Sequence, residues 1–358
     1  MQDLVAAFES QFAQKQFSAA SVTLKQLLKD YPDDLQLQVL LARFYDATGK
    51  PEKAEIIYRK LLRSQTQPKL LTQARQGLKA IEDAEIKQRK DRIAKALGIS
   101  GGETQGLLAV KPIAPEVRDR VVEKFARIFR LDLYSAKFKL PSRNLKILRT
   151  GTVAEMQVYA EELNSIDIPA TSVSLDAIAK IAVYNIDYFE LPSIHQVHAI
   201  HNDGAIAFRL NEVKARVEGI IPTFGQVVTV DAKHKLVWKD QILDRVRFCD
   251  FHLPERGCIL RFHDNHYKFD RGMQLQVKKS LNHLAPTVQE RWVALMQWVE
   301  QSFPEIPVHS DFTPFADMAM AYSETLKEIE HHIDLLRHKP SLWDNCFQLF
   351  SGMIFLDR

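Results

Sequence analysis

The chain has 358 residues, of which 46% are hydrophobic and 26% charged, with 13 Gly and 15 Pro. This composition is typical of a globular protein of two or three domains, and it excludes a disordered, collagen-like or membrane-spanning chain. Three cysteines in so long a chain argue against a disulfide framework, and the start carries no signal-peptide pattern, so we expect a cytoplasmic protein.

The net charge of +3 hides a strongly basic middle segment. Residues 1–49 contain 4 basic and 6 acidic side chains, residues 50–149 contain 24 and 11, and residues 150–358 contain 20 and 28. This asymmetry indicates either an acidic partner for the middle segment or its docking on the acidic ends. The alternative is that the basic side chains only solvate long helices.

The chain begins with an internal repeat whose period is 34 residues. A shift by this period superimposes four pairs, namely Lys15 and Gly49, Ala20 and Ala54, Leu24 and Tyr58, and Leu27 and Leu61. In the second copy Ala42 and Ala54 allow helices to approach closely, Gly49 supplies a left-handed residue, and Pro51 opens the next helix. With these, the pattern comprises Leu41, Tyr45, Tyr58, Leu61 and Pro68. It resembles the tetratricopeptide repeat, most clearly over residues 35–68.

The resemblance implies antiparallel helical hairpins over residues 1–97, with a groove that receives another polypeptide and performs no chemistry. The groove positions of the family fall on Gln36, Val39, Arg43, Asp46, Leu70 and Gln73. The alternative is that this short array packs against the rest of the chain.

Two features follow the repeats. Turn-forming residues at 98–106 and two later prolines predict a flexible linker over residues 98–114. A basic amphipathic helix then starts at Pro115, and we expect its apolar face to lie in a domain core. The alternative is that the helix lies on an anionic membrane. The residues that would face an anion or such a membrane are Arg118, Lys124, Arg127 and, near a later strand–helix turn, Arg149.

Residues 115–190 are predicted to form a small α/β unit, and residues 191–302 an antiparallel β-rich domain with a closing helix. The strand count, the stretches 225–230 and 239–246, and the trailing helix resemble the pleckstrin-homology and GRAM superfold. This resemblance implies a docking platform for a phosphoinositide or a peptide, without catalysis.

Histidines and cysteines cluster twice, at His195, His198 and His201, and at Cys249, His252, Cys258, His263 and His266. Because strand side chains alternate between faces, these ligands would diverge, so we expect no metal and no cofactor. A metal-dependent enzyme built around residues 249–266 is the remaining catalytic hypothesis.

Residues 303–358 are predicted as a C-terminal helical extension, with one long helix over 312–338 and an apolar segment over 342–356 that packs on the core. The sequence therefore predicts a multi-domain α+β protein. Its leading function is a non-enzymatic scaffold, adaptor or assembly factor that binds a partner protein through the repeats. The alternative is a membrane-peripheral sensor of a lipid headgroup or small anion; nucleic acid is not an expected partner.

Overall fold

The computed structural model describes residues 1–64, 67–193, 196–230, 234–277, 285–335, 337 and 340–357. The chain divides into two compact units, Met1–Lys95 and Ala96–Arg358. Within the described ranges, no helix has the length and apolar character needed to cross a membrane. The architecture is α+β, as predicted, with helical repeats first, then sheets, and helices at the end.

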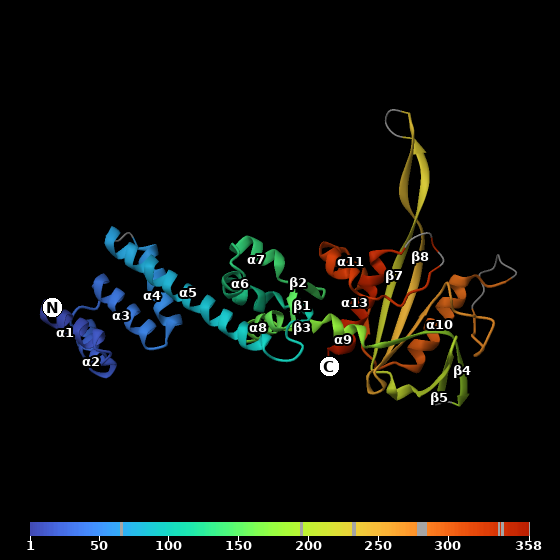
Figure 1. The fold of residues 1–358 in the computed structure, drawn as a ribbon, viewed down its shortest axis with the longest axis horizontal. Helices are drawn as coiled ribbons and strands as arrows, with labels where there is room; N and C mark the ends of the chain where they lie inside the picture. The colour runs from blue at the N-terminus through green and yellow to red at the C-terminus, as the bar shows by residue number, and fades with distance from the viewer. Residues whose placement is uncertain are drawn as a thin grey trace. The chain divides into compact units, whose positions relative to one another are not determined.

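The first unit consists of helices paired in hairpins (Figure 1). Its helices are α1 (Gln2–Ala13), α2 (Phe17–Asp30), α3 (Leu35–Ala47), α4 (Pro51–Arg63) and the start of α5 (Pro68–Leu97). Their apolar residues form two adjoining clusters, one centred on Phe8 and Leu24 and the other on Tyr58 and Ala74. The predicted helical hairpins are confirmed.

The 34-residue period is visible in the backbone itself. Lys15 and Gly49 end equivalent helices, and both adopt left-handed φ angles, of 59° and 74°. Ala20 and Ala54 are fully buried at the equivalent helix contacts, and Pro51 occupies the first turn of α4. Small residues where helices touch and a left-handed residue between them are the features that the sequence predicted.

The second unit begins with a three-stranded antiparallel sheet. Its strand order is β2-β1-β3, from β1 (Gln105–Val110), β2 (Lys146–Thr152) and β3 (Ala170–Ser174). The helices around it are α6 (Pro115–Phe129), α7 (Leu133–Lys139), α8 (Val153–Asn164) and α9 (Leu175–Ala179). Thr152 caps α8 by accepting a hydrogen bond from the Glu155 backbone N–H, as the capping-box spacing predicted.

The prediction of a flexible linker over residues 98–114 is wrong. This segment contains β1, the central strand of the sheet, in which Leu107 and Leu108 are fully buried on opposite faces. The strand is stabilised by pairing with β2 and β3, which lie far along the chain. The local sequence shows only a short apolar run after many turn formers, so this non-local pairing was not visible in it.

A mixed seven-stranded sheet forms the centre of the second unit. Its strand order is β10-β7-β8-β9-β4-β5-β6, from β4 (Ala182–Ser193), β5 (Gln196–His201), β6 (Gly204–Arg209), β7 (Ala215–Val230), β8 (Leu236–Leu253), β9 (Cys258–His263) and β10 (Val308–His309). Helix α10 (Val288–Ser302) covers one face, and 3-10 turns occur at Leu210–Glu212, Pro254–Arg256 and Met320–Tyr322.

Within residues 191–302, β5 pairs antiparallel with β6, and β8 with β7 and β9, whereas β4 runs parallel to β9 and β10 runs parallel to β7. A tight turn at Gly257, with φ of 66°, sends β9 back along β8 and places it beside β4. The two longest strands, β7 and β8, have 16 and 18 residues.

The predicted long helix over residues 312–338 is wrong as well. The chain forms α11 (Phe312–Ala319) and α12 (Ser323–Lys327) and then leaves helical geometry. Side chains from elsewhere take the carbonyl oxygens that a continuing helix would use. Asn345 donates to Ile329 O, Arg261 to His331 O and Asn185 to His332 O, at 2.6, 2.8 and 3.1 Å.

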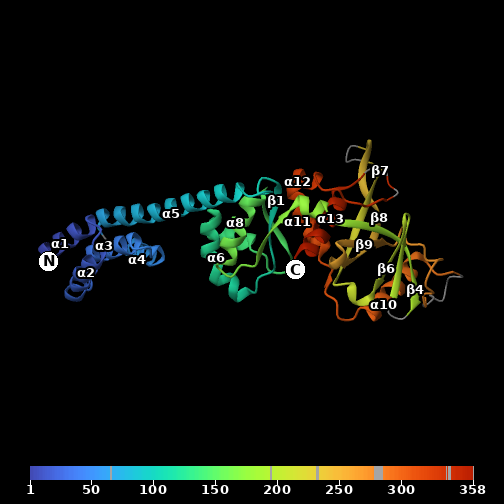
Figure 2. The ribbon, with the colours of Figure 1, turned by 60° about the horizontal axis from the view of Figure 1, so that its bottom comes forward.

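Helix α13 (Leu342–Leu356) packs on the core, as predicted for the apolar C-terminal segment. It lies with α11 between the three-stranded and seven-stranded sheets (Figures 1 and 2). Phe347 and Met353 share one cluster with Val173 of the small sheet and Phe248 of the large sheet. The segments predicted as separate domains after residue 114 therefore pack in one unit.

Candidate functional site

A groove on the first unit contains most of the residues predicted to bind a partner. It encloses about 180 Å³ and is lined by α1, α3 and α5 together with Asp34 and Gln67, which precede α3 and α5. Five of the predicted residues line it, namely Gln36, Val39, Arg43, Leu70 and Gln73. The sixth, Asp46, lies further along α3.

The groove has an apolar floor and an amide-bearing rim. Val39 and Leu70 are 3% and 5% exposed, because they also belong to the core that joins the second hairpin to α5. Gln36 is exposed and Gln73 half-buried. Val39 and Leu70 therefore contribute to stability as well as to the groove surface. Gln36 and Gln73, in contrast, can be replaced without removing a side chain from the core.

An ion pair crosses one side of the groove. Arg43 of α3 lies 2.8 Å from the Glu9 carboxylate of α1, and its guanidinium also lies over the Phe12 ring at 5.4 Å. Both charged side chains remain about two-fifths exposed. The charge of Arg43 is thus largely compensated inside the groove, while Lys69 and Asp34 add one charge of each sign to the lining.

Asp46 has a different environment. Desolvation raises the pKa of the Asp46 carboxyl group. Burial is the larger cause, and the nearby Asp46 charge the smaller one, that raise the pKa of Tyr58 to about 12. Tyr58 packs against Gly77 of α5, where no side chain would fit beside the ring. Asp46 therefore lies next to the packing of α3, α4 and α5, outside the groove lining.

The predicted anion-facing residues lie on two elements, with Arg118, Lys124 and Arg127 on α6 and Arg149 on β2. The apolar face of α6 is buried, with Val122 and Phe125 in the core of the small α/β unit, as expected for a domain helix. On the charged side, Lys124 is exposed, whereas Arg118 and Arg127 are half-buried. Arg149 pairs with Glu155 at 2.8 Å and lies over the Tyr159 ring.

The histidines and cysteines of residues 249–266 point to opposite sides of the sheet. Cys249 faces α10, whereas His252 faces α13; likewise Cys258 belongs to the α10 side and His263 stacks on Phe248 of the other side. Across the part of the chain that the structure describes, no three metal-binding side chains gather in one place. His195, from the first cluster, falls outside the described residues.

A fully buried polar network joins β8, β9 and α13. Arg261 makes two hydrogen bonds to the Asp250 carboxylate, at 2.9 and 2.7 Å, and Ser351 donates to the same carboxylate at 2.6 Å. Nε2 of His252 contacts the Ser351 hydroxyl at 2.9 Å. Burial lowers the pKa of His252 to about 4, so the ring is neutral near pH 7 and donates to Ser351.

This network does not have the arrangement of a catalytic serine. The Ser351 hydroxyl already donates its hydrogen bond to Asp250. Ser351, Asp250 and Arg261 are all 0% exposed. A substrate has no access to side chains in this position. The hydrogen bonds instead join β8, β9 and α13. Arg261 also donates to the backbone carbonyl of His331.

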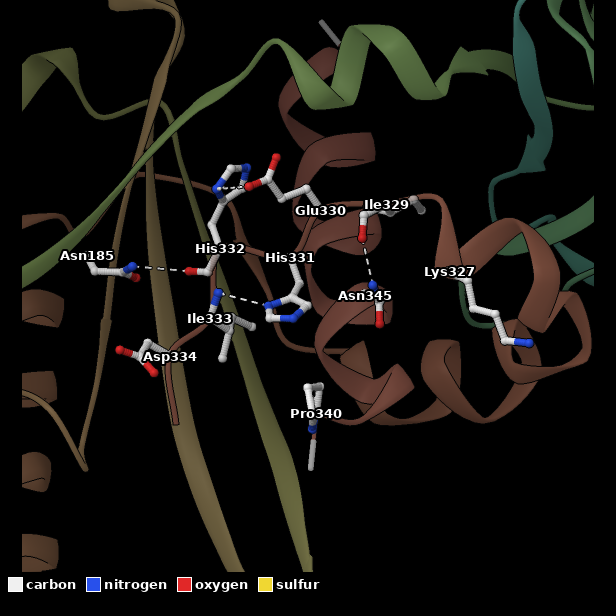
Figure 3. A pocket seen from close by; sticks show the side chains of 10 residues that line it. All are labelled: Asn185, Lys327, Ile329, Glu330, His331, His332, Ile333, Asp334, Pro340 and Asn345. Carbon is white, nitrogen blue, oxygen red and sulfur yellow. Dashed lines mark hydrogen bonds and ion pairs between the residues drawn. The ribbon is translucent and has the colours of Figure 1, made fainter. Parts of the chain in front are cut away.

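Sequence reasoning missed a second cavity, of about 610 Å³, between Asn185 and the segment after α12 (Figure 3). Its polar side chains mostly bind the backbone of that segment. Figure 3 shows Asn185 donating to His332 O, Asn345 donating to Ile329 O, and His331 accepting from the Ile333 N–H. Nine of the ten lining residues lie within residues 327–345, whereas Asn185 comes from β4, more than 140 positions earlier in the chain.

Comparison with known families identifies only the first unit. A family model described as "Tetratricopeptide repeat" matches residues 11–82, which run from the end of α1 through α2, α3 and α4 into α5. This match confirms the repeats that the 34-residue period predicted. No curated protein and no solved structure matches the chain in the two further comparisons.

Proposed function

We propose that the chain is a non-enzymatic interaction scaffold, acting as an adaptor or assembly factor, whose first unit binds a partner polypeptide. The observation that supports this most directly is the groove between α1, α3 and α5, which contains five of the six predicted positions. Tetratricopeptide repeats generally mediate protein–protein contact, and the family match at residues 11–82 covers α3 and the groove residues at the start of α5.

The chemistry of the groove favours a largely neutral segment with a small apolar anchor. Val39 and Leu70 offer an apolar floor, and the amides of Gln36 and Gln73 can both donate to and accept from a peptide backbone. Because Glu9 compensates Arg43, a strongly charged occupant gains little here. A cavity of about 180 Å³ accommodates one or two side chains, with the rest of the ligand along the rim.

The test uses a random-peptide library displayed on phage and selected against the full chain. Peptides recovered are measured by calorimetry against a groove-filled variant, Gln36→Trp with Gln73→Trp, and against Ile56→Trp on the outer helix α4. Ile56 is 67% exposed and belongs to a helix outside the groove lining, so it is a matched control. We expect the groove-filled variant to lose affinity by at least tenfold; equal affinity of all three proteins contradicts the proposal.

A second candidate function is contact with an anionic surface, and α7 favours it. Leu133, Tyr134 and Phe138 are 50%, 72% and 66% exposed on this short helix, beside the exposed side chains of Lys137 and Lys139. Residues 130–149 contain six basic side chains and one acidic side chain. Exposed aromatic groups among cations are typical of proteins that lie on anionic membranes.

Vesicle flotation distinguishes this candidate from simple solvation of a basic region. Vesicles with about 30% phosphatidylserine should bind the full chain, and added salt should weaken binding, because exposed charges are screened. Replacement of Tyr134 and Phe138 by Ser should abolish flotation, and replacement of Arg118, Lys124 and Arg127 by Gln should reduce it. Equal flotation with uncharged vesicles would argue against the candidate.

A further inference from the structure

The two longest strands continue beyond the sheet as a projecting hairpin, which we call the arm (residues 220–243; Figures 1 and 2). In the described structure, β7 pairs beyond Val217 only with β8, and β8 before Phe248 pairs only with β7. Isolated two-stranded ribbons are marginally stable in water, and their free edges tend to pair with other chains. A partner that covers or pairs with the arm would therefore stabilise it.

A bulge places most of the exposed apolar side chains of the arm on one face. Phe224 pairs with Ile242, but Thr223 pairs with Asp244, so Leu243 is the extra residue. Without this shift, the register of β8 would place its other set of side chains opposite Phe224 and its neighbours. The face that carries Phe224 has seven exposed apolar residues, Ile220, Phe224, Val228, Val230, Leu236, Trp238 and Ile242, with the polar residue Gln226 between Phe224 and Val228.

This apolar face is large for a surface without a partner. Its seven side chains are between 38% and 76% exposed, and Trp238 and Leu236 are the most exposed, at 69% and 76%. Taking about 150–250 Å² for a fully exposed large side chain, they present roughly 700 Å². The largest apolar patch of a typical monomer is about 300–600 Å², whereas each side of a standard protein interface contributes about 800 Å².

We propose that two copies of this chain associate through the apolar faces of their arms. Two such faces bury roughly 1,400 Å² together, which reaches the range of stable interfaces. The arm contains three basic and two acidic residues, so two copies do not repel each other strongly. The apolar face of one arm can pack on the apolar face of a second arm, as the two sheets of a β-sandwich pack on each other.

A lipid bilayer fits this surface less well. The apolar residues lie along the two paired strands, whereas Lys235, next to the first residue of β8, is exposed. A charged side chain near the end of a hairpin opposes its entry into hydrocarbon. A protein surface that covers the paired strands leaves this charge in water.

Sedimentation velocity of the full chain over a range of concentrations tests the proposal. We expect a monomer–dimer equilibrium, and Trp238→Glu should raise the dimer dissociation constant by at least about 100-fold, since each dimer loses two central contacts. Val237→Glu is the matched control, because Val237 is 37% exposed and pairs with Thr229 on the opposite face. Circular dichroism of each variant establishes that it is folded.

A second variant makes the test independent of charge. Leu236→Ser should also weaken the dimer, and Thr229→Ser should leave it unchanged. A wild-type chain that stays monomeric, or a dimer that Trp238→Glu and Leu236→Ser leave intact, overturns the proposal. So does a monomer whose arm binds uncharged phosphatidylcholine vesicles.

Discussion

Arg43 donates a hydrogen bond to Glu9 over 2.8 Å, and the two residues are 34 positions apart, which is the period of the repeat. They occupy equivalent positions in consecutive hairpins, on the helices that line the groove. If both repeats had the same charged residue at this position, like charges would lie side by side. Here the repeat has opposite charges at this position, so α1 and α3 attract each other across the groove.

Because this ion pair is exposed, its effect on stability should be small. We expect Arg43→Gln and Glu9→Gln to change the free energy of unfolding by less than about 1 kcal/mol each, with a coupling energy of about 0.2–1 kcal/mol in a double-mutant cycle. Urea unfolding of the four proteins measures it. A coupling above about 2 kcal/mol would show that the pair holds the hairpins together, rather than tuning the groove.

The left-handed residue of each repeat makes a sharper prediction. Lys15 adopts φ of 59°, and a left-handed conformation costs a side-chain-bearing residue about 1–2 kcal/mol. Lys15→Gly should therefore stabilise the first unit by about 1 kcal/mol, and Gly49→Ala should destabilise it by a similar amount. Thermal unfolding followed by circular dichroism compares the two variants with the parent. The same sign for both would contradict the equivalence of these positions.

The buried network of the second unit should respond strongly to the loss of one partner. Arg261→Met leaves the Asp250 carboxylate buried without its cation, and we expect a loss of about 3–5 kcal/mol in the free energy of unfolding. Arg256→Met is the control, because Arg256 and Glu212 form a partly exposed pair at 2.6 Å, which should contribute about 1 kcal/mol or less. Equal losses in denaturant unfolding would contradict this assignment.

Acid should weaken the second unit through its buried histidines. Burial lowers the pKa of His252 to about 4 and that of His263 to about 3, against 6.5 for a free histidine side chain. The unfolded chain thus binds more protons, and the stabilising contribution is complete above pH 6.5 and is lost as pH falls towards those values. Each histidine contributes up to about 1.4 kcal/mol per pH unit in that range.

The replacement His252→Gln tests this origin of the pH dependence. Glutamine can still donate to Ser351 but does not titrate, so the free energy of unfolding should fall less steeply between pH 6.5 and pH 4 than in the parent. Urea titrations at several pH values give the slope. An unchanged slope would assign the acid sensitivity to other groups.

Local patterns predicted much of this molecule. The alignment of Ala20 with Ala54 and of Lys15 with Gly49 depends only on spacing, and it located the hairpins, whereas the groove positions came from the family resemblance. The alternation of Cys249 and His252 between sheet faces was likewise a local property. In both cases the period of one element decides which side chains share a face.

Long-range interactions account for what the sequence did not reveal. Strand β1 is stabilised by partners at residues 146–152 and 170–174, and β9 aligns parallel to β4 through pairs such as Val183 with Ile259. The helix predicted after residue 312 ends because the side chains of Asn345 and Arg261 bind its carbonyl groups. None of these partners is visible in a local window.

Site-specific photocrosslinking tests the proposed groove most directly. A benzophenone amino acid is placed at position 36 or 73 of the full chain, and at position 56 as the outer-helix control, in the native host. The account predicts adducts with another polypeptide from positions 36 and 73 but not from 56. Crosslinks that join the groove to residues 96–358 of the same chain, or the same adducts from all three positions, would contradict it.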